Sequence, residues 1–282
     1  MNPRFGWMVL GTLGMTVACG SAPADPGTQS EGPAGATNLA GSAAAAGGPD
    51  TSALIGKAKE AIQNATFISD PQDYGLVLIV NNNGYCSGVL VTNFWVLTAG
   101  HCVVQNGFNF VFQETSKNSE ATQAALAVQT AVSPTFGLDV GLLKLSAPFS
   151  IGSVTSGYHL NIYGGDFNAA VGAPLVCLGY GNATPSETTS GDPNFGRPQG
   201  AVMGVSQLLS PTDYMAKPWN NDGQLMMPGD SGGPCYYALG FNGFLLLGIQ
   251  NDLFEPDNNP ADWYDSQARS DAFASWVNAT AI

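Results

Sequence analysis

Short apolar runs separated by Gly, Asn, Pro and Asp recur along the chain from residue 74 onward. The runs are rich in Val, Ile, Leu, Phe and Tyr, a composition typical of β-strands bounded by turns. They read YGLVLIV, SGVLVT, FWVLTA, FNFVFQ, VGLLKL, PLVCLGY and GFLLLGIQ, beginning at residues 74, 87, 94, 108, 140, 174 and 243. Because helical segments do not alternate with these runs, the pattern predicts an all-β barrel or sandwich and not a βαβ fold.

Two segments have the periodicity of a helix. Residues 52–64 are weakly amphipathic, and residues 269–282 place Phe273, Trp276 and Val277 on one helical face. Residues 181–200 carry Gly, Pro, Asn and Ser between two apolar runs, so we expect a surface loop there.

The first residues have the features of a secretory signal. Arg4 precedes an apolar stretch that is too short to span a bilayer, so residues 1–19 are excluded from the fold. The stretch ends in Thr-Val-Ala-Cys19, which resembles the bacterial lipobox whose cysteine is acylated; a plain signal peptide with a chance cysteine is the alternative. We therefore expect an exported protein, secreted or held at the cell envelope, with membrane contact only through a lipid on Cys19.

Composition divides the remainder of the chain into a tether and one folded part. Residues 20–53 are almost entirely small and polar, which predicts a flexible linker, and the folded domain is expected over 54–282. The 8 Lys and Arg residues stand against 21 Asp and Glu residues, giving a formal charge of -13. Since this balance lacks the excess of basic residues typical of a nucleic-acid-binding protein, we expect no nucleic-acid partner. We also expect a monomer.

Four cysteines lie within the expected domain. They are Cys86, Cys102, Cys177 and Cys235, an even number in an exported chain, which predicts two disulfides. Three pairings are possible on this ground alone. No C-x-x-C motif is present and the chain has 2 His, so neither a metal site nor another cofactor is expected.

Three segments place a chemically capable residue at the end of an apolar run. They are VLTAGHCV at 96–103, LDVGLLKL at 138–145 and PGDSGGPC at 228–235, and they supply His101, Asp139 and Ser231. A serine hydroxyl needs an adjacent imidazole to take its proton, and the imidazole needs a carboxylate that fixes its tautomer. The three residues therefore have the chemistry of a nucleophile, a base and an orienting acid.

These motifs resemble those of the trypsin/chymotrypsin-type serine proteases. The sequences TAGHC, DVGLLKL and GDSGGP occur in the family's order, and the resemblance covers residues 54–282. It implies two six-stranded antiparallel β-barrels packed together, with a C-terminal helix. It also implies catalytic roles for His101, Asp139 and Ser231.

The resemblance further implies an oxyanion hole and a disulfide pattern. The backbone N–H groups of Gly229 and Ser231 are the expected oxyanion donors, which a glycine-rich bend can aim at one point. The family's pairing implies bridges from Cys86 to Cys102 and from Cys177 to Cys235.

The sequence departs from the family at the activation site. The family is activated by cleavage before an I-V-G-G sequence, whose new amino group pairs with the acid that precedes the nucleophile, here Asp230. The nearest match is Leu54-Ile55-Gly56-Lys57, so we expect cleavage after Ala53 and a mature terminus at Leu54.

The primary specificity pocket departs as well. Leu225 stands where trypsin-like members have an Asp, and Asn251-Asp252-Leu253 corresponds to the S-W-G wall, so Leu225, Asn251 and Leu253 are the expected substrate-binding residues. An apolar base favours apolar or small side chains. A basic preference stays open, because Asp262 or Asp265 can align near the pocket floor.

The sequence thus predicts a serine endopeptidase that acts on proteins or peptides. Two alternatives remain. The first is a non-catalytic surface lipoprotein that uses the fold as a binding module. The second is an esterase, which the absence of a helix after G-D-S-G-G disfavours.

Overall fold

The computed structural model describes most of the chain after residue 65. The described residues are 66–68, 71–114, 121–149, 160–181, 197–219, 223–238, 243–256 and 263–281. All of them belong to one compact unit of the chain. The expected signal, Cys19, the linker, Leu54 and the helix at 52–64 lie outside the described residues, so they stay predictions.

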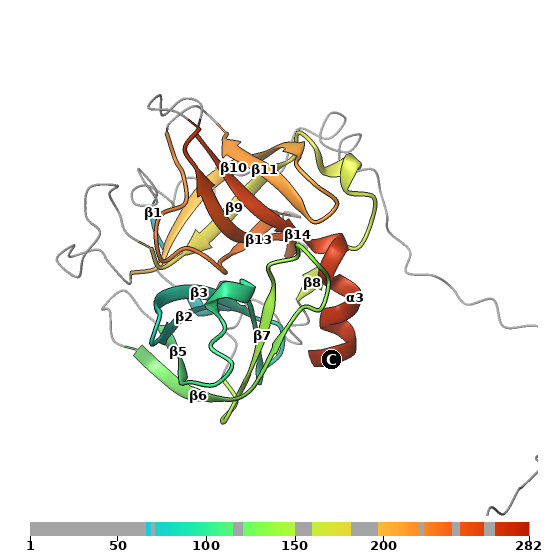
Figure 1. The fold of residues 1–282 in the computed structure, drawn as a ribbon. Coiled ribbons are helices and arrows are strands. Elements are labelled where there is room, and N and C mark those ends of the chain that lie inside the picture. Colours follow the sequence, from blue (N-terminus) through green and yellow to red (C-terminus); the bar gives the residue numbers. More distant parts are fainter. Residues whose placement is uncertain are drawn as a thin grey trace, which may run out of the picture. The chain divides into compact units, whose positions relative to one another are not determined.

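The first half of the described chain forms a closed six-stranded antiparallel barrel, drawn mostly in teal and green in Figure 1. Its strands are ordered β2-β3-β4-β7-β6-β5 around the barrel. Their bounds are Leu76–Asn81 for β2, Gly84–Leu90 for β3, Trp95–Thr98 for β4, Asn109–Glu114 for β5, Ala121–Val132 for β6 and Gly141–Leu145 for β7.

The second half forms another closed six-stranded barrel, drawn in yellow to red in Figure 1. Its order is β10-β11-β14-β13-β12-β9, and pairing of β9 with β10 closes it. The strands are β9 (Pro174–Gly179), β10 (Gln199–Leu208), β11 (Asp213–Pro218), β12 (Pro234–Ala238), β13 (Phe244–Phe254) and β14 (Tyr264–Arg269). Two short strands join its outside: β1 (Thr66–Phe67) pairs with β10, and β8 (Asn161–Ile162) runs parallel to β13.

The C-terminal helix α3 spans Ser270–Ala281 and confirms the helix predicted there. Phe273 and Val277 are fully buried and Trp276 is partly buried, in one core cluster with Leu246 of β13. No helix among the described residues is long and apolar enough to cross a membrane. Three short 3-10 helices complete the elements of the described residues: η1 (Pro71–Tyr74), η2 (Gly100–Cys102) and η3 (Phe167–Ala170).

The two barrels and the C-terminal helix confirm the predicted chymotrypsin-like fold. Five of the barrel strands were not among the predicted runs: β6, β10, β11, β12 and β14. The short strands β1 and β8 were not among them either. The loop predicted over 181–200 is wrong at its end, because Gln199 and Gly200 begin β10 and pair with β9. Residues 182–196 of that segment lie outside the described residues.

Candidate active site

The pairing of β4 with β7 places His101 beside Asp139. In this ladder Thr98 lies opposite Gly141, so the chain that leaves β4 and the chain that enters β7 meet at the same end of the barrel. His101 lies in η2 just after β4, and Asp139 lies between the buried residues Leu138 and Val140 just before β7. A strand ladder therefore brings together two residues that are 38 positions apart.

The imidazole and the carboxylate are joined at two points. Asp139 Oδ2 lies 2.6 Å from His101 Nδ1, and Asp139 Oδ1 accepts the backbone N–H of His101 at 2.8 Å. Gly100 permits this approach, since a Cβ there would lie 2.7 Å from Asp139 Oδ1. With the carboxylate ionised, Nδ1 carries the proton and donates a hydrogen bond to Asp139 Oδ2. This leaves Nε2 of the neutral ring as an acceptor.

The electrostatics of the pair favour its charged form. The hydrogen bond with Asp139 raises the pKa of His101 above its ordinary value; partial burial lowers it, and the charges of Asp139 and Asp252 raise it further. Burial raises the pKa of Asp139, but its hydrogen bonds and attraction to His101 outweigh burial and lower that pKa overall. The side chains are 49% and 36% exposed, so the ring is accessible from solvent.

Ser231 lies in the tight segment at residues 228–233, just before β12, and its backbone is held against the first barrel. We call this segment the serine's loop. Its carbonyl accepts the N–H of Ser87 at 2.8 Å and lies 3.6 Å from Cys102 Sγ, in the residue after His101. Gly232 has a φ of 86°, and a Cβ there would overlap the Thr98 side chain and the Ser87 carbonyl. The glycine thus allows the serine's loop to approach β3 and β4, and β4 leads directly into the segment that carries His101.

The Ser231 hydroxyl points to the carbonyl of Asn251, to which it donates a hydrogen bond of 3.4 Å. Within the described part of the chain, no hydrogen bond joins Ser231 to His101. Hydrogen bonds between reacting side chains are often long before substrate binds and shorten in its complex, and a rotation about χ1 changes the direction of a serine hydroxyl.

The backbone around Ser231 leaves two N–H groups without a partner among the described residues, those of Gly229 and Ser231. The neighbouring N–H groups are used: that of Asp230 binds Met227 O, that of Gly232 binds Gln250 O, and that of Gly233 binds Asp230 O. Gly229 adopts a φ of 102°, which L side chains rarely tolerate, so glycine is required for this bend.

Asp230 is fully buried in a space bordered by Gly179 and Gly181. Its carboxylate accepts the N–H groups of Gly181 and Met227, each at 2.8 Å. A Cβ on Gly179 or Gly181 would overlap the carboxylate. Burial raises the pKa of Asp230 to about 7, although both hydrogen bonds act in the opposite direction. No ion pair joins it to a described Lys or Arg, and the predicted partner Leu54 is outside the described residues.

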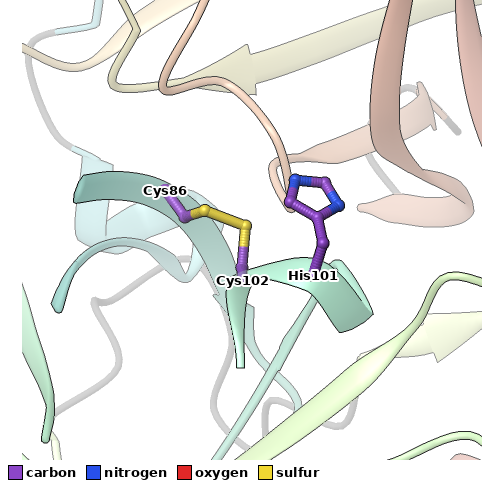
Figure 2. A group of neighbouring side chains, drawn as sticks. All are labelled: Cys86, His101 and Cys102. Atoms are coloured by element: carbon purple, nitrogen blue, oxygen red, sulfur yellow. A yellow bond between two sulfur atoms is a disulfide. The ribbon is translucent and has the colours of Figure 1, made fainter. Parts of the chain in front are cut away.

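Both disulfides implied by the resemblance are present in the structure. Cys86 of β3 is bridged to Cys102, which ties η2 to the barrel next to His101, as Figure 2 shows. Cys177 and Cys235 lie directly opposite each other in the β9–β12 ladder and form the second bridge. Although the ligand atoms of Cys86, His101 and Cys102 lie within 4.8 Å of one another, the two sulfurs are bonded together and are not thiolate ligands.

The three residues expected to bind substrate are all described, and a hydrogen bond joins one of them, Asn251, to Ser231. Leu225 is buried in the second barrel's core, Leu253 packs on the same cluster, and Asn251 contacts the Ser231 hydroxyl. Asp265 lies opposite Leu253 in the β13–β14 ladder. Its Oδ2 accepts the N–H of Met226 at 2.9 Å, and its Oδ1 is buried without a partner in the described structure. Asp262 lies outside the described residues.

Sequence reasoning missed two residues at this site. Ser87 is fully buried, donates to Gly229 O at 2.8 Å and accepts the N–H of Tyr180 at 2.9 Å, so it links the first barrel to the serine's loop. Its position directly after Cys86 was the available signal. Asp252 acts electrostatically on His101. An acid in place of the aromatic residue of the S-W-G wall was the signal there.

A family model described as Trypsin matches residues 69–277. The chain belongs to the trypsin family. Three curated relatives have the following names and identities. Alpha-fibrinogenase albofibrase of Trimeresurus albolabris is 27% identical over 192 residues, 63% of this chain and 72% of the relative. Achelase-1 of Lonomia achelous is 24% identical over 177 residues, 57% of this chain and 83% of the relative. Lectizyme of Glossina austeni is 31% identical over 80 residues, 25% of this chain and 29% of the relative.

Membership of the trypsin family supports serine protease activity and, with it, protein or peptide substrates. The two disulfides fit an oxidising, extracellular environment. The family does not favour the non-catalytic alternative.

Proposed function

We propose that the chain is a serine endopeptidase in which Ser231, His101 and Asp139 act together. Ser231 Oγ attacks the scissile carbonyl while His101 Nε2 takes its proton, and Asp139 holds the ring through Nδ1. His101 then protonates the leaving amine, which departs and leaves an ester on Ser231. In the second half of the reaction, His101 takes a proton from water as the water attacks the ester. His101 then returns this proton to Ser231 Oγ as the carboxylic acid product leaves. The observation that carries the proposal is the 2.6 Å contact between His101 Nδ1 and Asp139 Oδ2 beside the serine's loop.

The oxyanion that forms during attack would be bound by the N–H groups of Gly229 and Ser231. Both donors are unused within the described part of the chain, and the loop is fixed on both sides of them by the bonds of Asp230 and Ser87. Preorganised donors of this kind are worth about 10²- to 10³-fold each in rate.

The test is hydrolysis of internally quenched peptides by wild type and by Ser231→Ala, each as the full chain and as a chain that begins at Leu54. We expect the wild type to cleave in at least one form and the variant to lose nearly all activity with an unchanged circular dichroism spectrum. Equal cleavage by both proteins would exclude Ser231 as the nucleophile. Activity confined to the chain that begins at Leu54 would support activation by cleavage after Ala53.

For the primary pocket we propose a preference for apolar or small residues. Leu225, Met226 and Met227 are buried at its expected base, and Leu253 lies half-buried against the same core. Oδ1 of Asp265, which is buried without a hydrogen-bond partner in the described structure, favours one alternative preference. This alternative is a substrate Lys or Arg whose side chain reaches the Asp265 carboxylate. Cleavage profiles of wild type and Asp265→Asn separate the two, since only a basic preference would be lost in the variant.

We also propose that the protein is exported by the signal at 1–19 and acts as a monomer. Whether Cys19 is acylated is decided by mass spectrometry of the mature N-terminus, which would carry diacylglycerol on the cysteine. An unmodified mature terminus would indicate a plain signal peptide and a secreted enzyme.

A further inference from the structure

We propose that Asp252 is a specificity-determining residue, which binds a Lys or Arg side chain of the substrate close to the scissile bond. The proposal rests on the proposed peptidase function and adds a substrate class to it. It concerns a different carboxylate from Asp265, on the exposed side of strand β13.

Asp252 lies in strand β13 next to the residue that contacts the nucleophile. The carbonyl of Asn251 accepts the Ser231 hydroxyl, and Asp252 is the next residue of the strand. Because a strand advances about 3.4 Å per residue, its backbone lies within a short step of the reacting hydroxyl. A side chain as long as lysine, on a residue near the scissile bond, can therefore reach the Asp252 carboxylate.

An irregularity in the strand gives Asp252 its direction. The β13–β14 register shifts between Gln250 and Asp252, which makes Asn251 an extra residue. Such bulges re-aim the side chains that follow them and are common next to active sites. Gln250 and Asn251 are buried, whereas Asp252 is exposed. Its Oδ1 accepts the N–H of Leu253 at 2.9 Å, which holds the carboxylate close to the strand.

Among the described residues, the same part of β13 has an unpaired edge on which an extended peptide can lie. Pairing with β12 ends at Ile249, and the bonds between Gln250 and the Gly232–Gly233 segment extend the ladder by one residue. From Asn251 to Phe254, the strand pairs with β14 alone among the described residues. Addition of a strand to such an edge supplies backbone hydrogen bonds, while side-chain sites beside it supply specificity.

The charge of Asp252 is unbalanced in the described structure and reaches the reaction centre. None of the described Lys or Arg residues forms an ion pair with it. Its negative charge contributes to the raised pKa of His101, so its field extends to the imidazole. A substrate cation placed here would neutralise an acid whose charge adds to that of Asp139 at the catalytic ring.

The experiment uses pairs of quenched peptides that differ only in Lys against norleucine, a neutral residue with an unbranched side chain, at each of three positions on either side of the cleaved bond. We expect kcat/KM to be about two- to fivefold higher for Lys at one of these positions, the range of an exposed ion pair. The preference should disappear in Asp252→Asn. In Asp252→Lys it should reverse toward a Glu-containing peptide.

Glu255→Gln is the matched control, because Glu255 is exposed three residues further along and the substitution removes the same charge. Retention of the preference in this variant would support a local site and exclude the general field of the acidic protein. Equal loss in both variants would overturn the proposal, as would wild-type cleavage without any Lys preference. Absence of Ser231-dependent cleavage would instead overturn the proposed function itself, and this proposal with it.

Discussion

Ser87→Ala tests whether the contact between the barrels positions the serine's loop. The substitution removes one fully buried oxygen that donates to Gly229 O and accepts the N–H of Tyr180. An alanine satisfies neither group, and each buried polar group left unpaired costs about 1 to 3 kcal/mol. We therefore expect the free energy of unfolding to fall by about 2 to 4 kcal/mol.

Ser270→Ala is the matched control for this measurement. Ser270 is also fully buried, but its hydroxyl has no hydrogen-bond partner in the described structure. Removal of the same atom there breaks no bond and eliminates an unpaired buried hydroxyl, so the free energy of unfolding should not fall. Urea denaturation followed by tryptophan fluorescence gives both values.

Activity gives a second readout of the same perturbation. The Ser87 hydroxyl holds the carbonyl of Gly229, next to the N–H proposed to bind the oxyanion. Loosening this peptide should lower kcat more than it raises KM, by less than the roughly 10²-fold that loss of a donor costs. If Ser87→Ala is no less stable than Ser270→Ala and has wild-type kcat, the loop is held by other contacts and the reasoning is wrong.

Three other predictions follow from the site. The raised pKa of His101 should place the acid limb of the kcat/KM profile above the ordinary histidine pKa of about 6.5, with activity falling as the ring is protonated below that limb. A limb at or below the ordinary value would contradict the effect of Asp139 and Asp252. Gly232→Ala should lower the free energy of unfolding in urea by more than about 2 kcal/mol, because the added Cβ brings both backbone strain and steric overlap. Gly243→Ala should lower it less, because Gly243 has a φ of 95° but open space around the added Cβ. Equal losses in the two variants would show that overlap is unimportant. Replacement of both Cys86 and Cys102 by Ser opens a loop with a separation of 16 residues and should lower stability by about 3 kcal/mol in thermal unfolding; an unchanged midpoint would show that the bridge adds little.

The fold was predictable where strands carry Val, Leu, Ile and Phe in short continuous runs bounded by turn residues. Strand β6 was missed because its sequence, ATQAALAVQTAV, has small and polar residues that do not mark a strand locally. Its pairing with β5 and β7 closes the first barrel, so it is tertiary pairing that determines its conformation. Strand β14, with the sequence YDSQAR, was missed for the same reason.

The site was predictable for the residues that carry the chemistry, since motifs identify residue types. The motifs do not contain the contacts between barrels. Nothing local shows that the Ser87 hydroxyl reaches Gly229 across 142 positions, or that the Asp230 carboxylate occupies space left by Gly179 and Gly181. The direction of Asp252 likewise depends on a register shift between two strands, which only the folded structure supplies.

The most direct test of the account is covalent labelling with a fluorophosphonate, which reacts with a serine only when a neighbouring base activates its hydroxyl. Both the full chain and the chain that begins at Leu54 are labelled, digested and mapped by mass spectrometry. The account predicts one label on Ser231 in at least one of these chains, and none in Ser231→Ala or His101→Ala. Absence of label from both chains, or a label on another residue, would contradict it.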